Sequence, residues 1–174
     1  MGYPTISQFD VVFIQRTREN LQCNVTNNYT HLMNSLLGLI VLPRQYFEQG
    51  KANKNFFKIK VLESAELNFL QGKTTYNDEF GANIDIDKLV DNHRPLANLT
   101  IGTLMARLRN CIAHQSIRPT SENGEWKGII FRNYSSEKRS AKWEGNYDLQ
   151  VYVTMKELRK LCEFLTDNYL NSSN

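Results

Sequence analysis

Apolar residues recur at helical spacing in several parts of this 174-residue chain. The pattern predicts a helix over residues 7–27, with Ser7 as its N-cap, and a more apolar helix over residues 30–42. Pro43 should end the second helix, because proline disfavours a helical conformation in the residue before it. A third amphipathic helix is predicted over residues 51–70. The second helix is apolar nearly all round, which is typical of the central helix of a bundle.

The middle of the chain, residues 73–98, is acidic and follows no clear period. It is predicted to be a loop with a short helix near residues 86–92. A strong helical pattern then resumes over residues 100–116, with Thr100 as a suitable N-cap. Its apolar face consists of Ile101, Leu104, Met105, Leu108 and Ile112. This face predicts a helix that is packed against the core on one side.

Beyond Pro119 the period changes from that of a helix to that of a strand. Residues 120–124 have the composition of a turn, and residues 127–134 and 146–153 alternate as half-buried strands do. The segment between them, residues 135–145, is polar and basic. The simplest arrangement is an antiparallel β-hairpin.

A capping box, the Ser/Thr-x-x-Glu signature of a helix start, occurs at Thr154–Glu157. It predicts a final helix that extends to Leu170. We therefore predict a mainly α fold, a bundle of four to five helices with a small β-hairpin at about residues 127–153, inserted before the C-terminal helix. The length fits one domain over residues 1–174.

The composition of the chain excludes few classes of function. A net charge of +3 is compatible with an RNA partner but does not argue for one. Three scattered cysteines show no pattern of zinc ligands and indicate reduced thiols, so no metal or cofactor is expected. We expect a cytoplasmic protein with no membrane partner, because no signal-peptide pattern is visible and the longest apolar run is too short to span a bilayer.

Three residues with candidate chemistry lie on the predicted helix 100–116. Asn110 and His114 are one turn apart, nearly opposite the apolar face, and Arg109 precedes them. This set suits RNA cleavage, because a neutral imidazole can deprotonate a 2′-hydroxyl and a guanidinium can stabilise the charged transition state. An exposed polar helix face of the same composition is common, and residue types alone leave both interpretations open.

A strip of small side chains borders the same helix. Gly102, Ala106 and Ala113 lie between its apolar and polar faces, with Arg109 beside them. Small residues allow a second helix to come close. If that helix belongs to a second copy of the chain, two-fold symmetry would bring two copies of Arg109, Asn110 and His114 into one composite site.

The segment from Arg109 to His114, with Asn110 directly after the arginine, resembles the R-x(4–6)-H motif of HEPN-domain ribonucleases. Residues 34–43 resemble the second helix of a bacterial, often plasmid- or phage-associated HEPN branch. The resemblance implies a helical bundle, a homodimer with a shared cleft, and metal-independent RNA cleavage by a toxin or defence effector. It makes Arg109 and His114 the motif residues and Asn110 their usual polar companion.

Further RNA contacts are predicted at five basic residues, Arg107, Arg118, Arg132, Lys138 and Arg139. The hairpin adds Lys127, Lys142 and the aromatic residues Trp126, Tyr134 and Trp143, which together provide charge and stacking surface for single-stranded RNA. The plainer interpretation, which we favour for the hairpin, is a solvated element whose aromatic residues cap the bundle.

Two other functions remain open at this stage. The chain can be a catalytically inactive HEPN module that binds RNA or nucleotide, or that only dimerises. It can also be a structural helical bundle with no nucleic-acid role. A toxin would further imply an antitoxin or another partner protein.

Overall fold

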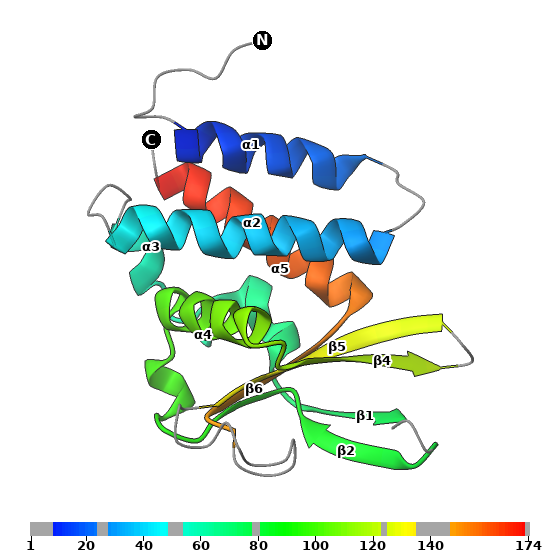
Figure 1. The fold of residues 1–174 in the computed structure, drawn as a ribbon. Coiled ribbons are helices and arrows are strands. Elements are labelled where there is room, and N and C mark those ends of the chain that lie inside the picture. Colours follow the sequence, from blue (N-terminus) through cyan, green and yellow to red (C-terminus); the bar gives the residue numbers. More distant parts are fainter. Residues whose placement is uncertain are drawn as a thin grey trace.

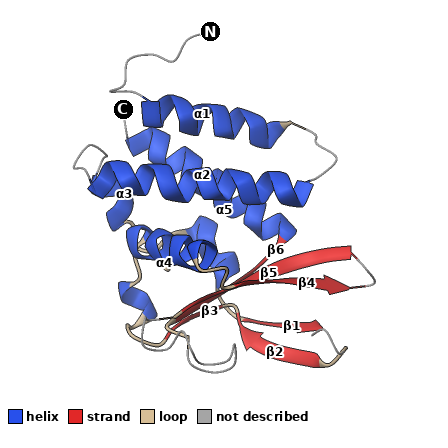
Figure 2. Ribbon diagram, in the orientation of Figure 1, coloured by secondary structure: helices blue, strands red, loops and turns tan. Residues whose placement is uncertain are grey.

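The computed structural model describes residues 9–23, 28–48, 54–77, 81–122, 125–134 and 147–172. Figure 1 shows the helices layered on one side of the molecule and the strands gathered below them. Figure 2 separates the two kinds of element in the same view. None of the described helices is long and apolar enough to cross a membrane.

Four long helices confirm four of the predicted ones. They are α1 (Phe9–Gln22), α2 (Asn28–Glu48), α4 (Ile101–Ala113) and α5 (Met155–Ser172). The predicted cap Ser7 lies outside the described residues. Their buried apolar side chains form one core cluster with the inner face of a sheet. Burial of that face holds the helices together.

Pro43 was expected to end the second helix, and this is wrong. Pro43 is buried inside α2, which continues to Glu48. Proline in a helix interior costs about 3 kcal/mol, because it removes one hydrogen bond and crowds the preceding turn. The residues of α2 that are buried in the core offset this cost. They include Leu32, Leu36, Leu39 and Ile40.

A single helix over residues 51–70 is also wrong. The structure has a short α3 (Lys54–Lys58) and, after a break, a 3-10 helix η2 (Ala65–Leu70). The break follows from backbone pairing with the segment before α4. Ile101 N donates to Ile59 O at 2.8 Å, and Val61 N donates to Leu99 O at 2.9 Å. These long-range hydrogen bonds replace the helical ones.

The acidic segment 73–98 is not a loop with a short helix. It forms an antiparallel pair, β1 (Lys73–Asn77) and β2 (Asn83–Asp87), followed by β3 (Leu89–Asp91) and a short 3-10 helix η3 (Leu96–Asn98). Alternation explains β2, where partly buried isoleucines are flanked by exposed polar residues. Those isoleucines pack on a small cluster of Tyr76, Ile130 and Tyr152.

The predicted hairpin is confirmed as β5 (Glu125–Asn133) and β6 (Leu149–Thr154), which pair antiparallel. It is part of a four-stranded sheet in the order β3-β6-β5-β4. The expected turn at 120–124 is wrong for residues 120–122, because β4 (Ile117–Glu122) pairs with β5 there, and residues 123–124 lie outside the described residues. Pro119 is tolerated because β4 is an edge strand, where a missing backbone N–H breaks no ladder bond.

The fold is therefore mixed rather than mainly α. The helical layer covers one face of the four-stranded sheet, and the β1–β2 pair packs on the other face through the small cluster. The capping box is confirmed. Thr154 N donates to Glu157 Oε2 at 2.9 Å, and Glu157 N donates to Thr154 Oγ1 at 3.3 Å. These bonds fix the point where the chain leaves the sheet and enters α5.

Candidate functional site

Helix α4 carries the candidate residues and is held firmly at its start. Thr100 is the N-cap, and its Oγ1 accepts a hydrogen bond from Thr103 N at 3.2 Å. The apolar face is buried as the pattern predicts, with Leu104, Met105 and Leu108 at most 1% exposed. The helix packs against α2 and β5, so its remaining face is the one that solvent reaches.

The three motif residues lie at the C-terminal end of α4. Arg109 and His114 are exposed, and Asn110 is half-buried. Arg109 Nη1 donates to Asn110 Oδ1 at 3.3 Å. His114 is the C-cap of the helix, and its backbone N donates to Asn110 O at 3.0 Å. The structure therefore brings Arg109, Asn110 and His114 together on one accessible turn.

The backbone that follows His114 is strained. Gln115 has φ of 54°, in the left-handed region that usually requires glycine. Gln115 N donates to Ile112 O at 3.1 Å, and Ser116 N donates to Cys111 O at 2.7 Å. These two bonds form the Schellman motif that closes a helix. They fix the backbone of His114 between α4 and β4.

Cys111 lies inside the motif but has no nucleophilic role. Its side chain is fully buried, and burial raises the pKa of the Cys111 thiol to about 12. The reactive form of cysteine is the thiolate. Burial raises the pKa of Cys162 to about 12 as well. Covalent chemistry through either thiol is therefore disfavoured near neutral pH.

Arg107, one of the predicted RNA contacts, is engaged within the protein. Its Nη1 donates to Asp91 Oδ1 at 3.1 Å and to Asp148 O at 3.4 Å. The side chains of Arg107 and Asp91 are 14% and 0% exposed. Asp91 Oδ1 also accepts from the backbone N–H groups of His93 and Arg94. Arg107 thus ties α4 to the end of β3, and we assign it a structural role.

Two of the other predicted RNA contacts, Arg118 and Arg132, lie on the neighbouring strands β4 and β5. Arg132 is 7% exposed, donates from Nε to Gln150 Oε1 at 2.9 Å, and stacks over the Tyr147 ring at 4.9 Å. Arg118 is half-buried on the edge strand β4. Lys138 and Arg139, like Lys142 and Trp143, lie outside the described residues.

A histidine that the sequence analysis missed lies near the same helix. His93 Nε2 and Asp148 Oδ1 are 2.6 Å apart, and the side chains are 49% and 6% exposed. Asp148 is also the residue whose carbonyl accepts from Arg107. The signal for this pair was weak, because 55 positions separate the two residues. The cluster of turn-forming residues at 91–95 was the only local hint.

The strip of small residues is partly filled by the chain itself. A Cβ on Gly102 would lie 2.9 Å from the carbonyl oxygen of Phe57, so the backbone of α3 occupies the space that the missing side chain leaves. Ala106 is half-buried, and Ala113 is exposed. The expectation of a seam for a second chain is therefore wrong at Gly102 and stays a prediction at Ala113.

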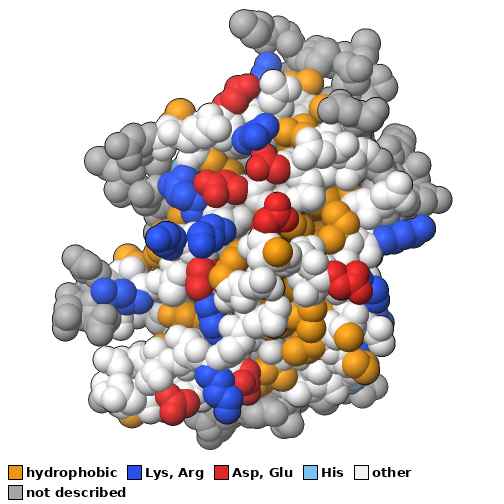
Figure 3. Space-filling view, turned by 180° about the vertical axis from the view of Figure 1, so that it is seen from behind, with side chains coloured by type: hydrophobic (Ala, Val, Ile, Leu, Met, Phe, Trp, Pro, Cys, Tyr) orange, Lys and Arg blue, Asp and Glu red, His pale blue; other side chains and the backbone are white. Residues whose placement is uncertain are grey.

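Charged side chains of both signs share one face of the molecule. On the face opposite to the view of Figure 1, acidic and basic side chains are interspersed over the described residues (Figure 3). Binding to nucleic acid through phosphates alone needs a field of one sign. Among the described residues, no three histidine, cysteine or carboxylate side chains come together in a way that could hold a metal ion.

Comparison with known proteins gives one match. A family model described as HEPN pEK499 p136 matches residues 1–174. No curated protein and no solved structure matches the chain. The family match covers the whole chain, including the turn that carries Arg109, Asn110 and His114.

Proposed function

Because the chain belongs to the HEPN pEK499 p136 family, we propose that it is a metal-independent endoribonuclease. The observation that carries the proposal is the exposed turn at the end of α4. There Arg109 and His114 face solvent, on either side of the half-buried Asn110. The resemblance of this segment to the R-x(4–6)-H motif assigns these residues to the reaction.

The proposed reaction is attack of a 2′-hydroxyl on the adjacent phosphate. A neutral His114 imidazole takes the hydroxyl proton, and the bond from phosphorus to the 5′-oxygen breaks. The products are a 2′,3′-cyclic phosphate and a 5′-hydroxyl. Arg109 stabilises the charge that gathers on the phosphoryl oxygens, because a guanidinium can donate to two of them at once.

Asn110 acts as a positioning residue in this proposal. Its Oδ1 accepts from Arg109 Nη1, and its backbone carbonyl accepts from His114 N. One residue therefore contacts both of the others. The protonated imidazole that donates to the leaving 5′-oxygen would come from His114 of a second chain, in a homodimer with a shared site.

The biological role that we propose is that of a toxin or defence effector. This rests on the resemblance to HEPN proteins of plasmid- and phage-associated type. An antitoxin or another partner protein would then control the activity. RNA binding without cleavage would instead indicate an inactive HEPN module.

The test is cleavage of a defined RNA by the purified protein in the presence of EDTA. We expect products that end in 2′,3′-cyclic phosphate, identified by mass spectrometry. His114→Ala and Arg109→Ala should each lower the rate by about 100-fold or more, since acid–base catalysis and charge stabilisation each contribute about that factor. Arg18→Ala is the control, because Arg18 is an exposed arginine on α1. Unchanged cleavage in both motif variants would remove the assignment.

A further inference from the structure

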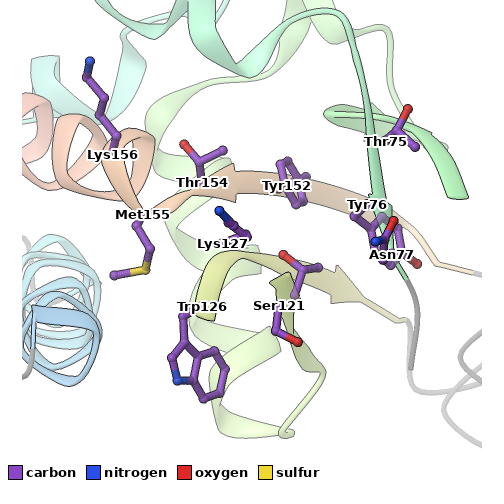
Figure 4. Close-up of a pocket in the computed structure, with 11 residues that line it drawn as sticks. Thr75, Tyr76, Asn77, Ser121, Trp126, Lys127, Tyr152, Thr154, Met155 and Lys156 are labelled. Carbon is purple, nitrogen blue, oxygen red and sulfur yellow. The ribbon is translucent and has the colours of Figure 1, made fainter. Parts of the chain in front are cut away.

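A cavity of about 450 Å³ lies at the far end of the four-stranded sheet, away from the motif turn of α4. It is lined by β1, by the ends of β4 and β6, by the start of β5 and by the first turn of α5. Figure 4 shows its side chains, with Trp126 on one side, Tyr76 and Asn77 on another, and Ser121 between them in this view. The volume is typical of a small-ligand pocket.

An irregularity in β5 explains why two consecutive residues line this cavity. Ser121 pairs with Trp126 and Thr120 pairs with Gly128, so β5 has one extra residue, Lys127, at this point. In a regular strand consecutive side chains point to opposite faces. A bulge changes the direction of the side chains beside it, and here both Trp126 and Lys127 line the cavity.

Tyr152 forms part of the wall, and a glycine makes room for it. A Cβ on Gly128 would lie 2.9 Å from the Tyr152 hydroxyl oxygen and 2.6 Å from Val153 O. The phenol can therefore lie across β5 only because residue 128 has no side chain. Burial raises the pKa of Tyr152 above its ordinary value, so this phenol is neutral and can donate a hydrogen bond.

The chemistry of the lining fits a nucleotide. Trp126 is 53% exposed, which is unusual for so large an apolar side chain, and its indole is a surface on which a base can stack. Lys127 supplies positive charge for a phosphate, whereas the Lys156 side chain points away from Lys127 (Figure 4). None of the described residues that line the cavity is acidic. Hydroxyl and amide groups of the lining, such as those of Thr75 and Asn77, can bond to the edges of a base.

We propose that this cavity binds one nucleotide, with its base stacked on Trp126 and its phosphate held by Lys127. The nucleotide is either a unit of a single RNA strand or a free mononucleotide, since both present the same base and phosphate. The proposal does not depend on cleavage at His114. It concerns a second site, which lies along β4 from the motif turn.

Binding is measured with two probes, adenosine 5′-monophosphate on the wild-type protein and a fluorescent RNA octamer on the His114→Ala protein. Trp126→Ala should weaken binding by about ten-fold or more, because stacking of one base contributes about that factor. Lys127→Ala should reduce the salt dependence, lowering the slope of log K against log salt by about 0.7. Lys160→Ala is the matched control, since Lys160 is an exposed lysine one turn along α5 and outside the lining.

Each outcome decides the proposal. Sensitivity of both probes to Trp126→Ala supports it, and sensitivity of one probe supports it and identifies the source of the nucleotide. The proposal is overturned if neither probe binds, or if the Trp126 and Lys127 variants bind both probes as Lys160→Ala does. Far-ultraviolet circular dichroism checks that each variant is folded. If the protein binds the probes but does not cleave RNA, the proposed ribonuclease function is rejected and the proposed nucleotide site is kept.

Discussion

Arg107 and Arg109 lie two residues apart on α4, and their surroundings differ. Arg107 is 14% exposed and paired with a fully buried carboxylate. Arg109 is exposed, and its Nη1 donates to Asn110 Oδ1. Both are arginines on the polar side of one amphipathic helix. Their roles are therefore set by what packs against the helix rather than by their positions on it.

Arg107→Ala should destabilise the fold by about 3 kcal/mol, measured as the free energy of unfolding in urea. The substitution leaves the Asp91 carboxylate buried without its ion pair, and breaking such a pair is more costly than the pair is stabilising. Arg109→Ala is the matched control and should change stability by less than about 0.5 kcal/mol, as exposed substitutions do. Equal stability of the two variants would contradict the structural role of Arg107.

Sequence analysis could not separate these two arginines. A helical wheel places Arg107 beside His114, and so predicted an RNA contact there. Arg107 pairs with Asp91, which lies 16 positions upstream at the end of β3. The acidic composition of this part of the chain did not indicate a strand there. The motif residues were easier to find, because their contacts are local. Arg109, Asn110 and His114 are related by one turn of a single helix.

At the scale of elements, the helices followed from the sequence where their apolar period was strong. The strands β1 and β2 were missed, although Ile84 and Ile86 alternate with polar residues as a strand requires. Ile84 and Ile86 pack against Tyr76, Ile130 and Tyr152. The local sequence pattern does not show these contacts. Helix α2 was cut short at Pro43 for a similar reason. The unfavourable effect of Pro43 on a helix can be read from the sequence, whereas the burial of α2 in the core, which outweighs it, cannot.

One contact between elements should be visible in the pH dependence of stability. Glu157, in the first turn of α5, forms an ion pair with Lys88 just before β3, at 2.5 Å. Burial alone would raise the pKa of Glu157, but bonds from Lys88 and the Thr154 N–H outweigh it and the pKa lies below its ordinary value. The pair therefore adds stability above the pKa of the unfolded state, about 4.3, and this stability is lost as pH falls through the folded-state pKa.

Glu157→Gln tests this contribution, because glutamine keeps the capping box and removes only the charge. We expect a loss of about 2 kcal/mol in the free energy of unfolding at pH 7, the usual size for a hydrogen bond to a charged group. The difference from wild type should shrink below about pH 4. Glu163→Gln, at an exposed position on α5, should show no such dependence. A difference that stays constant from pH 7 to pH 3 would exclude the ion pair as its cause.

At the scale of the whole molecule, β4 connects the two candidate sites. It begins three residues after His114, and its far end lines the cavity at Thr120 and Ser121. A strand rises about 3.3 Å per residue, so Thr120 and Ser121 lie about 10–13 Å along β4 from Ile117, where the strand begins after the motif turn. A single RNA strand could therefore contact Trp126 while another part of it reaches Arg109 and His114.

The shared-site proposal predicts a dimer in solution, with twice the 20.2 kDa mass of one chain. Since α3 already fills the space at Gly102 and Ala106 is half-buried, Ala113 is the exposed small position of the strip. Ala113→Gln adds bulk there without charge and keeps a good helix former. Two-fold symmetry places the added side chain in the interface twice. We expect dissociation to increase by about ten-fold or more, because overpacking costs about 1–3 kcal/mol at each site.

Sedimentation velocity measures the dimer, and cleavage is followed at the same protein concentrations. Loss of dimer and loss of cleavage should run in parallel, and a higher protein concentration should restore both, because Arg109 and His114 are unchanged in the variant. Ala97→Gln is the matched control at an exposed alanine of η3. A wild-type monomer with full activity would show that one chain holds the complete site. An active Ala113→Gln dimer would place the interface on another face of the molecule.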